Sequence, residues 1–331
     1  MTVPLREIAS AVLVDASGRR QLLVVGAGDK PDKTSRTLLL NLDTRVWTTG
    51  APRLCPGDHM AAVTVDNMLY LVGGFVSGKL CNMTQIYNPV LNVWTAGPPP
   101  PVVTAAASAV AIERSIYYCG GLRNETLLAD SVNAPVTNCW RYDVDVGAWT
   151  AIASMPFGVH HAAGATDGSR FWIFGGRQTA GNSLGRNANF TQVYDPTTNT
   201  WDSSASGRYA ALPVARGSMG AAVYMRGRFF VMGGEEFCGS PSTCAKNTTL
   251  LTSLAVYNRT DRYDPVTNSW DLPAPGMALP RHGMYPVVAA GPAGVTNVDG
   301  APVAYLCGGG PQAKTYYSAY CDYMTLASDV I

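Results

Sequence analysis

One unit recurs along this chain, an apolar strand that ends in two glycines. It occurs as LYLVGG (69–74), IYYCGG (116–121), FWIFGG (171–176), FFVMGG (229–234) and AYLCGG (304–309), with LLVVGAG (22–28) as a weaker first copy. Self-similarity at a near-constant period is typical of repeat architectures, in which each copy is one supersecondary unit. The glycine signatures therefore predict six repeats of a single unit.

A second signature follows four of these copies and combines a tyrosine with a tryptophan seven residues later. Its sequences are IYNPVLNVW (86–94), RYDVDVGAW (141–149), VYDPTTNTW (193–201) and RYDPVTNSW (262–270), and LDTRVW (42–47) is a version with a shorter turn. Asp-Pro followed by Asn is turn chemistry, because proline presets φ and Asx side chains bond the local backbone. We expect a hairpin here, and a tryptophan that fills the wedge between neighbouring units.

The repeat tryptophans are Trp47, Trp94, Trp149, Trp201 and Trp270, which lie 47, 55, 52 and 69 residues apart. Together the two signatures resemble the kelch repeat, which has a period of about 50 residues and four strands in each propeller blade. The resemblance implies an all-β fold, a six-bladed β-propeller of kelch type with four antiparallel strands per blade. We expect residues 1–331 to form a single propeller.

Closure of the ring is the least determined part of the fold. Residues 1–7 (MTVPLRE) are interpreted as a linker into the first strand. The last segment, Thr325–Ile331, lacks a repeat tryptophan and is expected to form the outer strand of blade six. The alternative is that a strand is missing because the chain was cut from a longer protein.

The charge pattern excludes several classes of partner. Lys and Arg number 24 against 23 for Asp and Glu, and no basic run occurs, which argues against a nucleic-acid partner. No apolar run reaches the roughly 18–20 residues of a membrane helix, so we expect no membrane insertion. The start, MTVPLREIAS, shows no signal-peptide pattern.

In a kelch blade the strands a to d run outward from the axis, so the d–a and b–c loops share one face. Kelch proteins generally bind partners on that face, and function resides in loops grafted on a fold. The longest b–c loops are expected in blades three (Leu122–Asn138), four (Arg177–Asn189) and five (Glu235–Asn258). We expect the binding surface to be lopsided toward these blades.

Three of the four histidines are aligned on one repeat position, at the start of the innermost strand of blades two, four and six. They are His59, His160 and His282, and Met219 takes this position in blade five. Three imidazoles around an axis can hold a metal. No carboxylate or thiolate accompanies them at fixed spacing, and kelch repeats often carry this histidine, so we expect a structural role, no metal and no cofactor. His161 is one residue out of phase and is expected to point to the other side of the strand.

Arginines and glutamates flank the same loops, namely Arg53, Arg177, Arg216, Arg281, Glu235 and Glu236. They either form a polar site for a carboxylated sugar or an acidic peptide, or are solvated loop charges. The chain contains no P-loop, no dinucleotide-binding GxGxxG, no GxSxG, no HExxH and no CxxC. These absences leave no catalytic motif.

The repeat map offers a partner for each of the eight cysteines. The candidate pairs are Cys55–Cys81, Cys119–Cys139, Cys238–Cys244 and Cys307–Cys321, since neighbouring strands and shared loops bring such thiols within bridging distance. Disulfides favour an extracytoplasmic or secreted location, although no signal peptide is visible. The alternative is free thiols that pack as small apolar residues.

Five glycosylation sequons occur, at Asn82, Asn124, Asn189, Asn247 and Asn258. Three of them place the asparagine five residues before the repeat tyrosine, so they are one inherited repeat feature. Asn124 and Asn247 remain as independent glycosylation candidates.

The sequence favours a non-enzymatic scaffold that binds a protein or a glycan through one propeller face. The alternative is a carbohydrate-active enzyme, because some kelch propellers are sialic-acid mutarotases that use polar residues in a central funnel. A copper radical oxidase of the galactose oxidase type needs His and Tyr ligands in a longer, seven-bladed protein, and is disfavoured.

Overall fold

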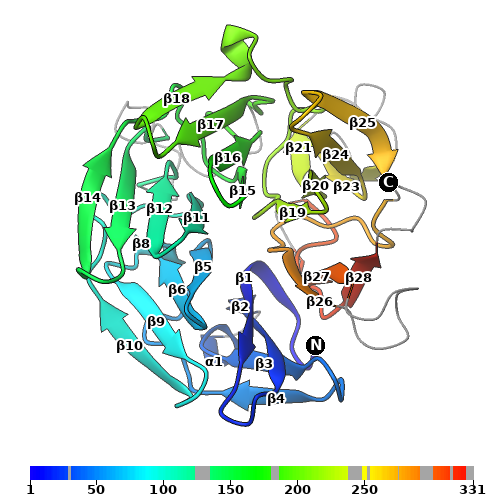
Figure 1. The fold of residues 1–331 in the computed structure, drawn as a ribbon. Coiled ribbons are helices and arrows are strands. Elements are labelled where there is room, and N and C mark those ends of the chain that lie inside the picture. Colours follow the sequence, from blue (N-terminus) through cyan, green and yellow to red (C-terminus); the bar gives the residue numbers. More distant parts are fainter. Residues whose placement is uncertain are drawn as a thin grey trace.

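The computed structural model describes residues 1–28, 31–123, 135–179, 186–237, 248–251, 254–274, 276–290, 301–313 and 316–325. Six antiparallel sheets stand around a central axis as the blades of a propeller, in chain order (Figure 1). The first strand of each sheet is innermost. The predicted six-bladed, all-β propeller is confirmed.

The first four blades contain four strands each. Blade one has β1 (Leu5–Val14), β2 (Arg20–Gly28), β3 (Thr37–Asn41) and β4 (Trp47–Gly50), with a short helix, α1 (Pro31–Thr34), between β2 and β3. Blade two has β5 (Ala61–Val65), β6 (Met68–Val72), β9 (Thr84–Asn88) and β10 (Val93–Gly97). Blade three has β11 (Ser108–Ile112), β12 (Ser115–Cys119), β13 (Cys139–Asp143) and β14 (Ala148–Ile152). Blade four has β15 (Ala163–Thr166), β16 (Phe171–Phe174), β17 (Thr191–Asp195) and β18 (Thr200–Ser203).

The last two blades are less regular. Blade five has β19 (Val223–Met225), β20 (Arg228–Met232), β24 (Thr260–Asp264) and β25 (Ser269–Ala274). Blade six has three strands within the described residues, β26 (Val287–Ala290), β27 (Pro302–Cys307) and β28 (Cys321–Thr325). Thr325 ends the third of these strands, and residues 326–331 of the expected outer strand lie outside the described part of the chain.

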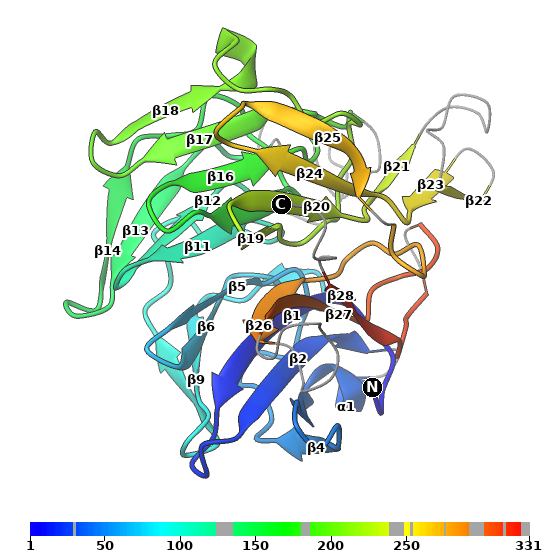
Figure 2. The same ribbon diagram turned by 45° about the vertical axis from the view of Figure 1, so that its right-hand side comes forward.

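Two b–c loops carry extra β-structure. In blade two, β7 (Phe75–Val76) and β8 (Lys79–Leu80) form a small hairpin. In blade five, β21 (Glu235–Phe237), β22 (Thr248–Leu251) and β23 (Leu254–Tyr257) form a sheet in the order β21–β23–β22. Figure 2 shows this sheet standing out beyond the strands of blade five.

The Tyr–Asn–Trp signature joins neighbouring blades through hydrogen bonds. In blade two the Tyr87 hydroxyl donates to Asn92 Oδ1 (2.8 Å), and the same oxygen accepts from the Ala51 amide of blade one (2.8 Å). The Trp94 indole N–H donates to the Ala51 carbonyl (3.1 Å). Blades four and five repeat this pattern with their own residues. The signature is therefore structural, and its tryptophan occupies the wedge between blades as predicted.

The paired glycines fit where neighbouring backbones nearly touch. Gly73 has φ of 66°, and a Cβ atom on it would lie 2.0 Å from the Thr104 carbonyl oxygen of the next blade. Only glycine combines positive φ with so close an approach. The glycine signature therefore marks the contact between one blade's second strand and the loop that enters the next blade.

Three of the four predicted cysteine pairs form disulfides in the structure. Cys119 faces Cys139 across β12 and β13, and Cys307 faces Cys321 across β27 and β28. Cys55 and Cys81 join the loop that enters blade two to the b–c loop of that blade. Cys238 and Cys244, like the sequon residues Asn124 and Asn247, lie outside the described residues.

Candidate functional site

The central channel is wide at one end and filled at the other. A cavity of about 530 Å³ lies among the innermost strands and is lined mostly by small side chains such as Ala11, Ala62, Ala109 and Ala222. At the end where the innermost strands begin, a second cavity measures only about 30 Å³. Tyr285 lines both and donates its hydroxyl to the Ala62 carbonyl (2.6 Å). The filled end belongs to the face of the d–a and b–c loops.

One residue per blade shares a left-handed backbone conformation at this filled end, just before or within the innermost strand. These residues are Glu7 (φ 44°), His59 (58°), Ala106 (54°), His161 (56°), Ser218 (58°) and Gly283 (61°). Non-glycine residues seldom adopt this conformation. Five successive backbone hydrogen bonds then run from blade to blade: Ala106 N to His59 O, His161 N to Ala106 O, Ser218 N to His161 O, Gly283 N to Ser218 O and Ile8 N to Gly283 O, at 2.7–3.0 Å. This inter-blade ring fixes the six residues, and the side chains of the five that are not glycine, around the channel mouth.

The predicted alignment of the histidines is wrong by one residue. The backbone places His161 in the position of His59, whereas His160 and His282 share the preceding position, where they pair with Arg177 and Gly310. Met219 follows the left-handed residue Ser218 and therefore belongs to the next repeat position. The small residues that guided the alignment are too alike to reveal a slip of one residue.

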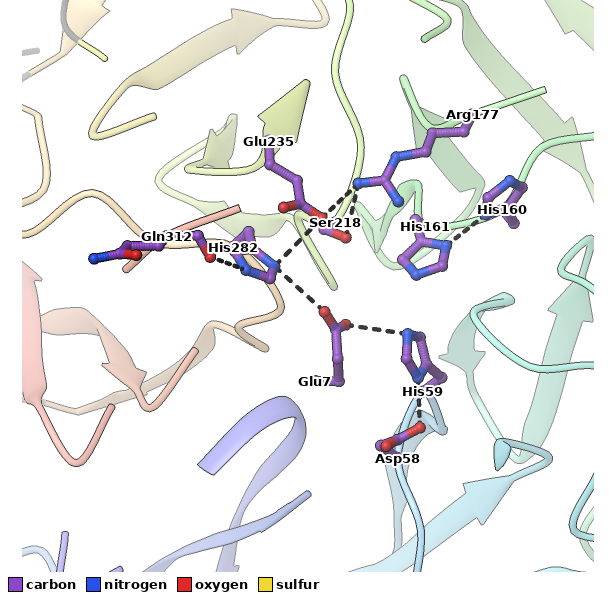
Figure 3. Close-up of polar contacts among 10 residues, drawn as sticks. All are labelled: Glu7, Asp58, His59, His160, His161, Arg177, Ser218, Glu235, His282 and Gln312. Atoms are coloured by element: carbon purple, nitrogen blue, oxygen red, sulfur yellow. Dashed lines mark hydrogen bonds and ion pairs between the residues drawn. The ribbon is translucent and has the colours of Figure 1, made fainter. Parts of the chain in front are cut away.

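The carboxylate of Glu7 is at the centre of the polar cluster, between two imidazoles (Figure 3). Its Oε2 atom lies 3.6 Å from His59 Nε2, and its Oε1 atom lies 3.3 Å from His282 Nδ1. His59 Nδ1 is 2.5 Å from Asp58 Oδ1, and His282 Nε2 is 2.9 Å from the Gln312 carbonyl oxygen. The expected linker, residues 1–7, is therefore wrong, because β1 begins at Leu5 and supplies a partly buried acid.

A second acid, Glu235, faces the cluster from β21. Its Oε1 atom accepts a hydrogen bond from Arg177 Nη2 (2.7 Å) and lies 3.5 Å from His282 Nδ1. Arg177 also donates to the Ser218 hydroxyl (3.1 Å). Arg177 and Glu235 are both almost fully buried, so this is an internal ion pair rather than a solvated loop charge.

Two hydrogen-bond contacts connect His161 through His160 to Thr179, away from the channel. The Nδ1 atoms of the two histidines are 2.5 Å apart, and His160 Nε2 is 2.9 Å from the Thr179 hydroxyl. The ring of His161 also meets that of His59 edge to face, with centroids 4.9 Å apart. His161, expected to point away from the other histidines, is instead part of the cluster.

The cluster holds its histidines in two charge states. Burial raises the pKa of the Glu7 carboxyl, but the attraction of His59, His282 and Arg177 outweighs burial and lowers this pKa to about 2. Burial opposes the charge on His282, yet Glu235 and Glu7 outweigh it and raise the His282 pKa. Burial, followed by the nearby positive charge of Arg177, lowers the pKa of both His160 and His161 well below the usual value. The two acids therefore favour the charged form of His282, whereas the surroundings of His160 and His161 favour their neutral forms.

The other arginines are not part of this cluster. Arg216 is fully buried and pairs with Asp261 (2.8 Å) while donating to the Gly233 carbonyl (2.7 Å). Arg281 pairs with Asp322 in the same manner in blade six. Arg53 is buried against backbone carbonyls, including that of Gly57 (2.8 Å). Neither expectation for these three arginines holds, because they neither form an open polar site nor lie solvated on loops.

Glu236 also lies apart from the cluster, with its carboxylate bonded to the Tyr257 hydroxyl. Burial raises the pKa of Glu236. Of the nine ligand-face candidates, the structure brings together His59, His160, His282, Arg177 and Glu235. Sequence reasoning missed Glu7, Asp58, His161 and Ser218. The one sequence feature that indicated these residues is the acid at residue 7, about one repeat length before His59.

Comparison with known proteins agrees with this architecture. The model of the Kelch motif matches residues 56–101 and 104–156. The Kelch-like protein terF of Aspergillus terreus is 26% identical over 300 residues, which cover 87% of this chain and 60% of that protein. The mouse Kelch-like protein 23 is 24% identical over 74% of this chain and 38% of its own length. The chain thus spans between about two fifths and three fifths of the length of these relatives.

A solved structure gives the same result for the fold. The protein described as YjhT superposes with a TM-score of 0.73, and the match covers 99% of this chain and 96% of that one at 16% identity. At this identity the likeness concerns the fold alone. Among the described residues, no helix has the length and apolar character that crossing a membrane requires.

Proposed function

Because this chain belongs to the kelch-repeat family of β-propellers, we propose that it is a non-enzymatic scaffold that binds a partner protein through its d–a and b–c loop face. The observation that carries the proposal is the form of this face. The channel mouth is filled from within by paired side chains, and within the described residues two of the surrounding loops carry extra β-structure.

The filled mouth favours a macromolecular partner over a small substrate. Pockets for small molecules commonly measure about 300–1,000 Å³, whereas the cavity among Glu7, His59, His161 and Ser218 measures about 30 Å³. The charged groups beside it are already engaged with one another. A partner on this face would therefore contact the loops and not the channel.

The outward loops supply a raised contact surface. The β7–β8 hairpin lies in the b–c loop of blade two. The β21–β23–β22 sheet stands out from blade five (Figure 2). Leu54, on the loop that enters blade two, is 47% exposed, and Lys79 lies at the exposed tip of the hairpin. Function carried by loops on a rigid scaffold is the usual arrangement in such folds.

The sugar-enzyme alternative has less support. It relied on arginines open to a carboxylated sugar, but Arg53, Arg216 and Arg281 are buried against protein carbonyls and carboxylates. The wide cavity on the other side is lined mainly by Ala, Val, Ser, Thr and Gly, with Asp167, Tyr224 and Tyr285 as its ionisable side chains, and the Tyr285 hydroxyl is already bonded to the Ala62 carbonyl. General acid–base chemistry on a sugar needs positioned titratable groups.

The test compares variants on the two propeller faces. One variant carries Leu54→Arg and Lys79→Glu on the loop face. Its matched control carries Val146→Asp and Val266→Asp, in turns of the opposite face where the side chains are 74% and 86% exposed. Each full chain is used in quantitative affinity enrichment with cross-linking.

We expect one protein set to be enriched by the wild type and by the control, and to fall at least about tenfold with the loop-face variant, as desolvated interface substitutions do. Cross-links should involve the loop face. Equal enrichment by all three chains, or loss only in the control, would contradict the proposal. Binding to immobilised glycans without any protein partner, or anomer exchange of a free acidic sugar followed by NMR, would replace it with the carbohydrate alternative.

A further inference from the structure

Three donor groups from three different blades converge at the filled channel mouth. They are the Glu7 carboxylate of blade one, the His59 imidazole of blade two and the His161 imidazole of blade four. We propose that these groups form a site for one divalent first-row transition metal ion, with zinc as its principal occupant. The site differs from the histidine set aligned in the sequence, and it opposes the expectation that the protein holds no metal.

The geometry suits a small ion. One ligand atom from each of the three residues lies within 4.8 Å of the others, and His59 Nε2 is 3.6 Å from Glu7 Oε2. Zinc bonds of about 2.0–2.1 Å place tetrahedral ligands roughly 3.3 Å apart, so inward shifts of about 1 Å are enough to complete the site. Two histidines with one carboxylate are a common donor set for zinc, which leaves a fourth position to water.

Outer groups already orient both imidazoles toward this point. The Asp58 carboxylate holds Nδ1 of His59 at 2.5 Å, which leaves Nε2 directed at Glu7. The Nε2–H group of His160 can donate to the Thr179 hydroxyl, and Nδ1 of His160 can then accept from the Nδ1–H group of His161. In this arrangement Nε2 of His161 carries no proton and has a free lone pair. Carboxylate and carbonyl partners on the far nitrogen are the usual support of metal-bound histidine.

The inner nitrogen of His161, Nε2, makes no hydrogen bond within the residues that the structure describes. The residue is 5% exposed. The adjoining cavity of about 30 Å³ is lined by Glu7, His59, His161 and Ser218. That volume is close to the share of one water molecule in the liquid, about 30 Å³, and therefore accommodates an ion with little rearrangement.

The surrounding charges are compatible with an added cation. Glu7, Asp58 and Glu235 supply three carboxylates around this point, and the Arg177 guanidinium lies beside Glu235. The competing description is an ion-free network, in which a protonated His59 bridges Asp58 and Glu7. The two descriptions differ at His161, because the ion-free network makes no use of its inner nitrogen.

An ion at this point would cross-link three blades across the channel. It would join the first blade to the second and fourth by bonds that the strands alone do not make. We therefore expect its removal to lower the thermal midpoint of unfolding while leaving the β-sheet circular dichroism spectrum unchanged at room temperature. Ligands that bind only the folded state stabilise it by mass action.

The test is metal binding by the full chain, purified without a histidine tag. Zinc content is measured by mass spectrometry, followed by chelator stripping, blocking of free thiols and titration with Zn²⁺ against a chromophoric chelator. We expect one zinc per chain and, with Co²⁺, the intense visible absorption of a four-coordinate site. His161→Gln and Glu7→Gln should weaken binding at least about 100-fold, and Asp58→Asn about 10–100-fold. Glu236→Gln is the control for the loss of one partly buried acid outside the cluster and should bind like the wild type.

Circular dichroism confirms that each variant is folded before it is scored. Absence of stoichiometric zinc binding by the stripped wild type would overturn the proposal. So would undiminished binding by folded His161→Gln, which would leave the ion-free network as the correct description. Binding that disappears once thiols are blocked would assign the metal to cysteines instead. None of these outcomes bears on partner binding at the loops.

Discussion

The Oε1 atom of Glu7 lies 3.3 Å from Nδ1 of His282, so the innermost strand of the first blade and the entry to the last blade meet in an ion pair between a partly buried acid and a buried histidine. The backbone joins the same blades, because Leu5 N donates to Ser318 O and Ile8 N to Gly283 O, both at 3.0 Å. The beginning of the chain therefore fastens the two ends of the propeller together.

The Glu7–His282 pair should behave as a coupled unit. Removing one partner leaves the other charge buried, so Glu7→Gln and His282→Gln are each expected to lower the free energy of unfolding by about 2–4 kcal/mol. In a double-mutant cycle the coupling should be about 1–3 kcal/mol. Urea unfolding in the presence of a chelator measures it, and strict additivity would show that the two residues act independently.

Arg216 should be a stability residue and not a ligand-binding one. Arg216→Ala leaves Asp261 fully buried without one of its cations, and should cost about 3–5 kcal/mol. Arg208→Ala is the matched control, since Arg208 pairs with Asp202 at a side-chain exposure of 63% and should cost less than about 1 kcal/mol. Equal losses in chemical denaturation would argue against the structural role.

Substitutions at the left-handed repeat position should change the stability of the protein in opposite directions in two blades. Ala106 has φ of 54°, so Ala106→Gly should stabilise the protein by about 0.5–1 kcal/mol through relief of the left-handed conformation. Gly283→Ala should destabilise it, because the new Cβ atom would lie 2.7 Å from Glu7 Oε1. Thermal unfolding of both variants reports the signs, and a shared sign would contradict the equivalence of the positions.

Asp15 should account for part of the pH dependence of the protein's stability. Burial raises the pKa of this carboxyl, but hydrogen bonds from Arg19, Gln21 and Ser17 outweigh burial and lower the pKa to about 2. A lowered folded pKa gives stability above the unfolded value of about 3.9, which is lost as the pH falls toward 2. Asp15→Asn should therefore be less stable than the wild type at neutral pH, by a margin that narrows below about pH 4. Urea unfolding across pH measures the margin, with exposed Glu113→Gln as a control that should show none.

The pairing of the cysteines can be tested by thiol alkylation followed by mass spectrometry. The three described bridges use six of the eight cysteines, so alkylation of the unfolded chain without reductant should label at most the remaining two, Cys238 and Cys244. Reduction first should expose all eight. Replacing Cys119 and Cys139 together by serine should cost about 3 kcal/mol, as expected for a loop of this size. Eight labels without reductant would mean that the bridges do not form.

The propeller was predictable because its determinants are repeated. The Gly-Gly pairs contact the next blade in the same way, and the Tyr–Asn–Trp set makes the same contacts in blades two, four and five, so recurrence exposes their role even in one sequence. Gly73 against Thr104 and Trp94 against Ala51 are examples. The disulfides followed from the same map, because equivalent strands bring Cys119 and Cys139 into register.

The polar cluster was not predictable in the same way. Its register depends on a backbone conformation that residues as different as Glu7, Ala106 and Ser218 adopt, so no residue type marks it. Alignment on the small residues that follow placed His160 where His161 belongs. Glu7 was missed because the first blade lacks the Tyr–Trp signature in full, which hid where its innermost strand begins.

The inter-blade ring of hydrogen bonds at the channel mouth also governs how the molecule can open. The amides of Ala106, His161, Ser218 and Gly283 are bonded across blade boundaries and not within one sheet. Opening a single blade at the axis therefore breaks bonds on both of its sides. Local opening is disfavoured there, and hydrogen exchange at these four amides should report the concerted unfolding of several blades rather than the fraying of one.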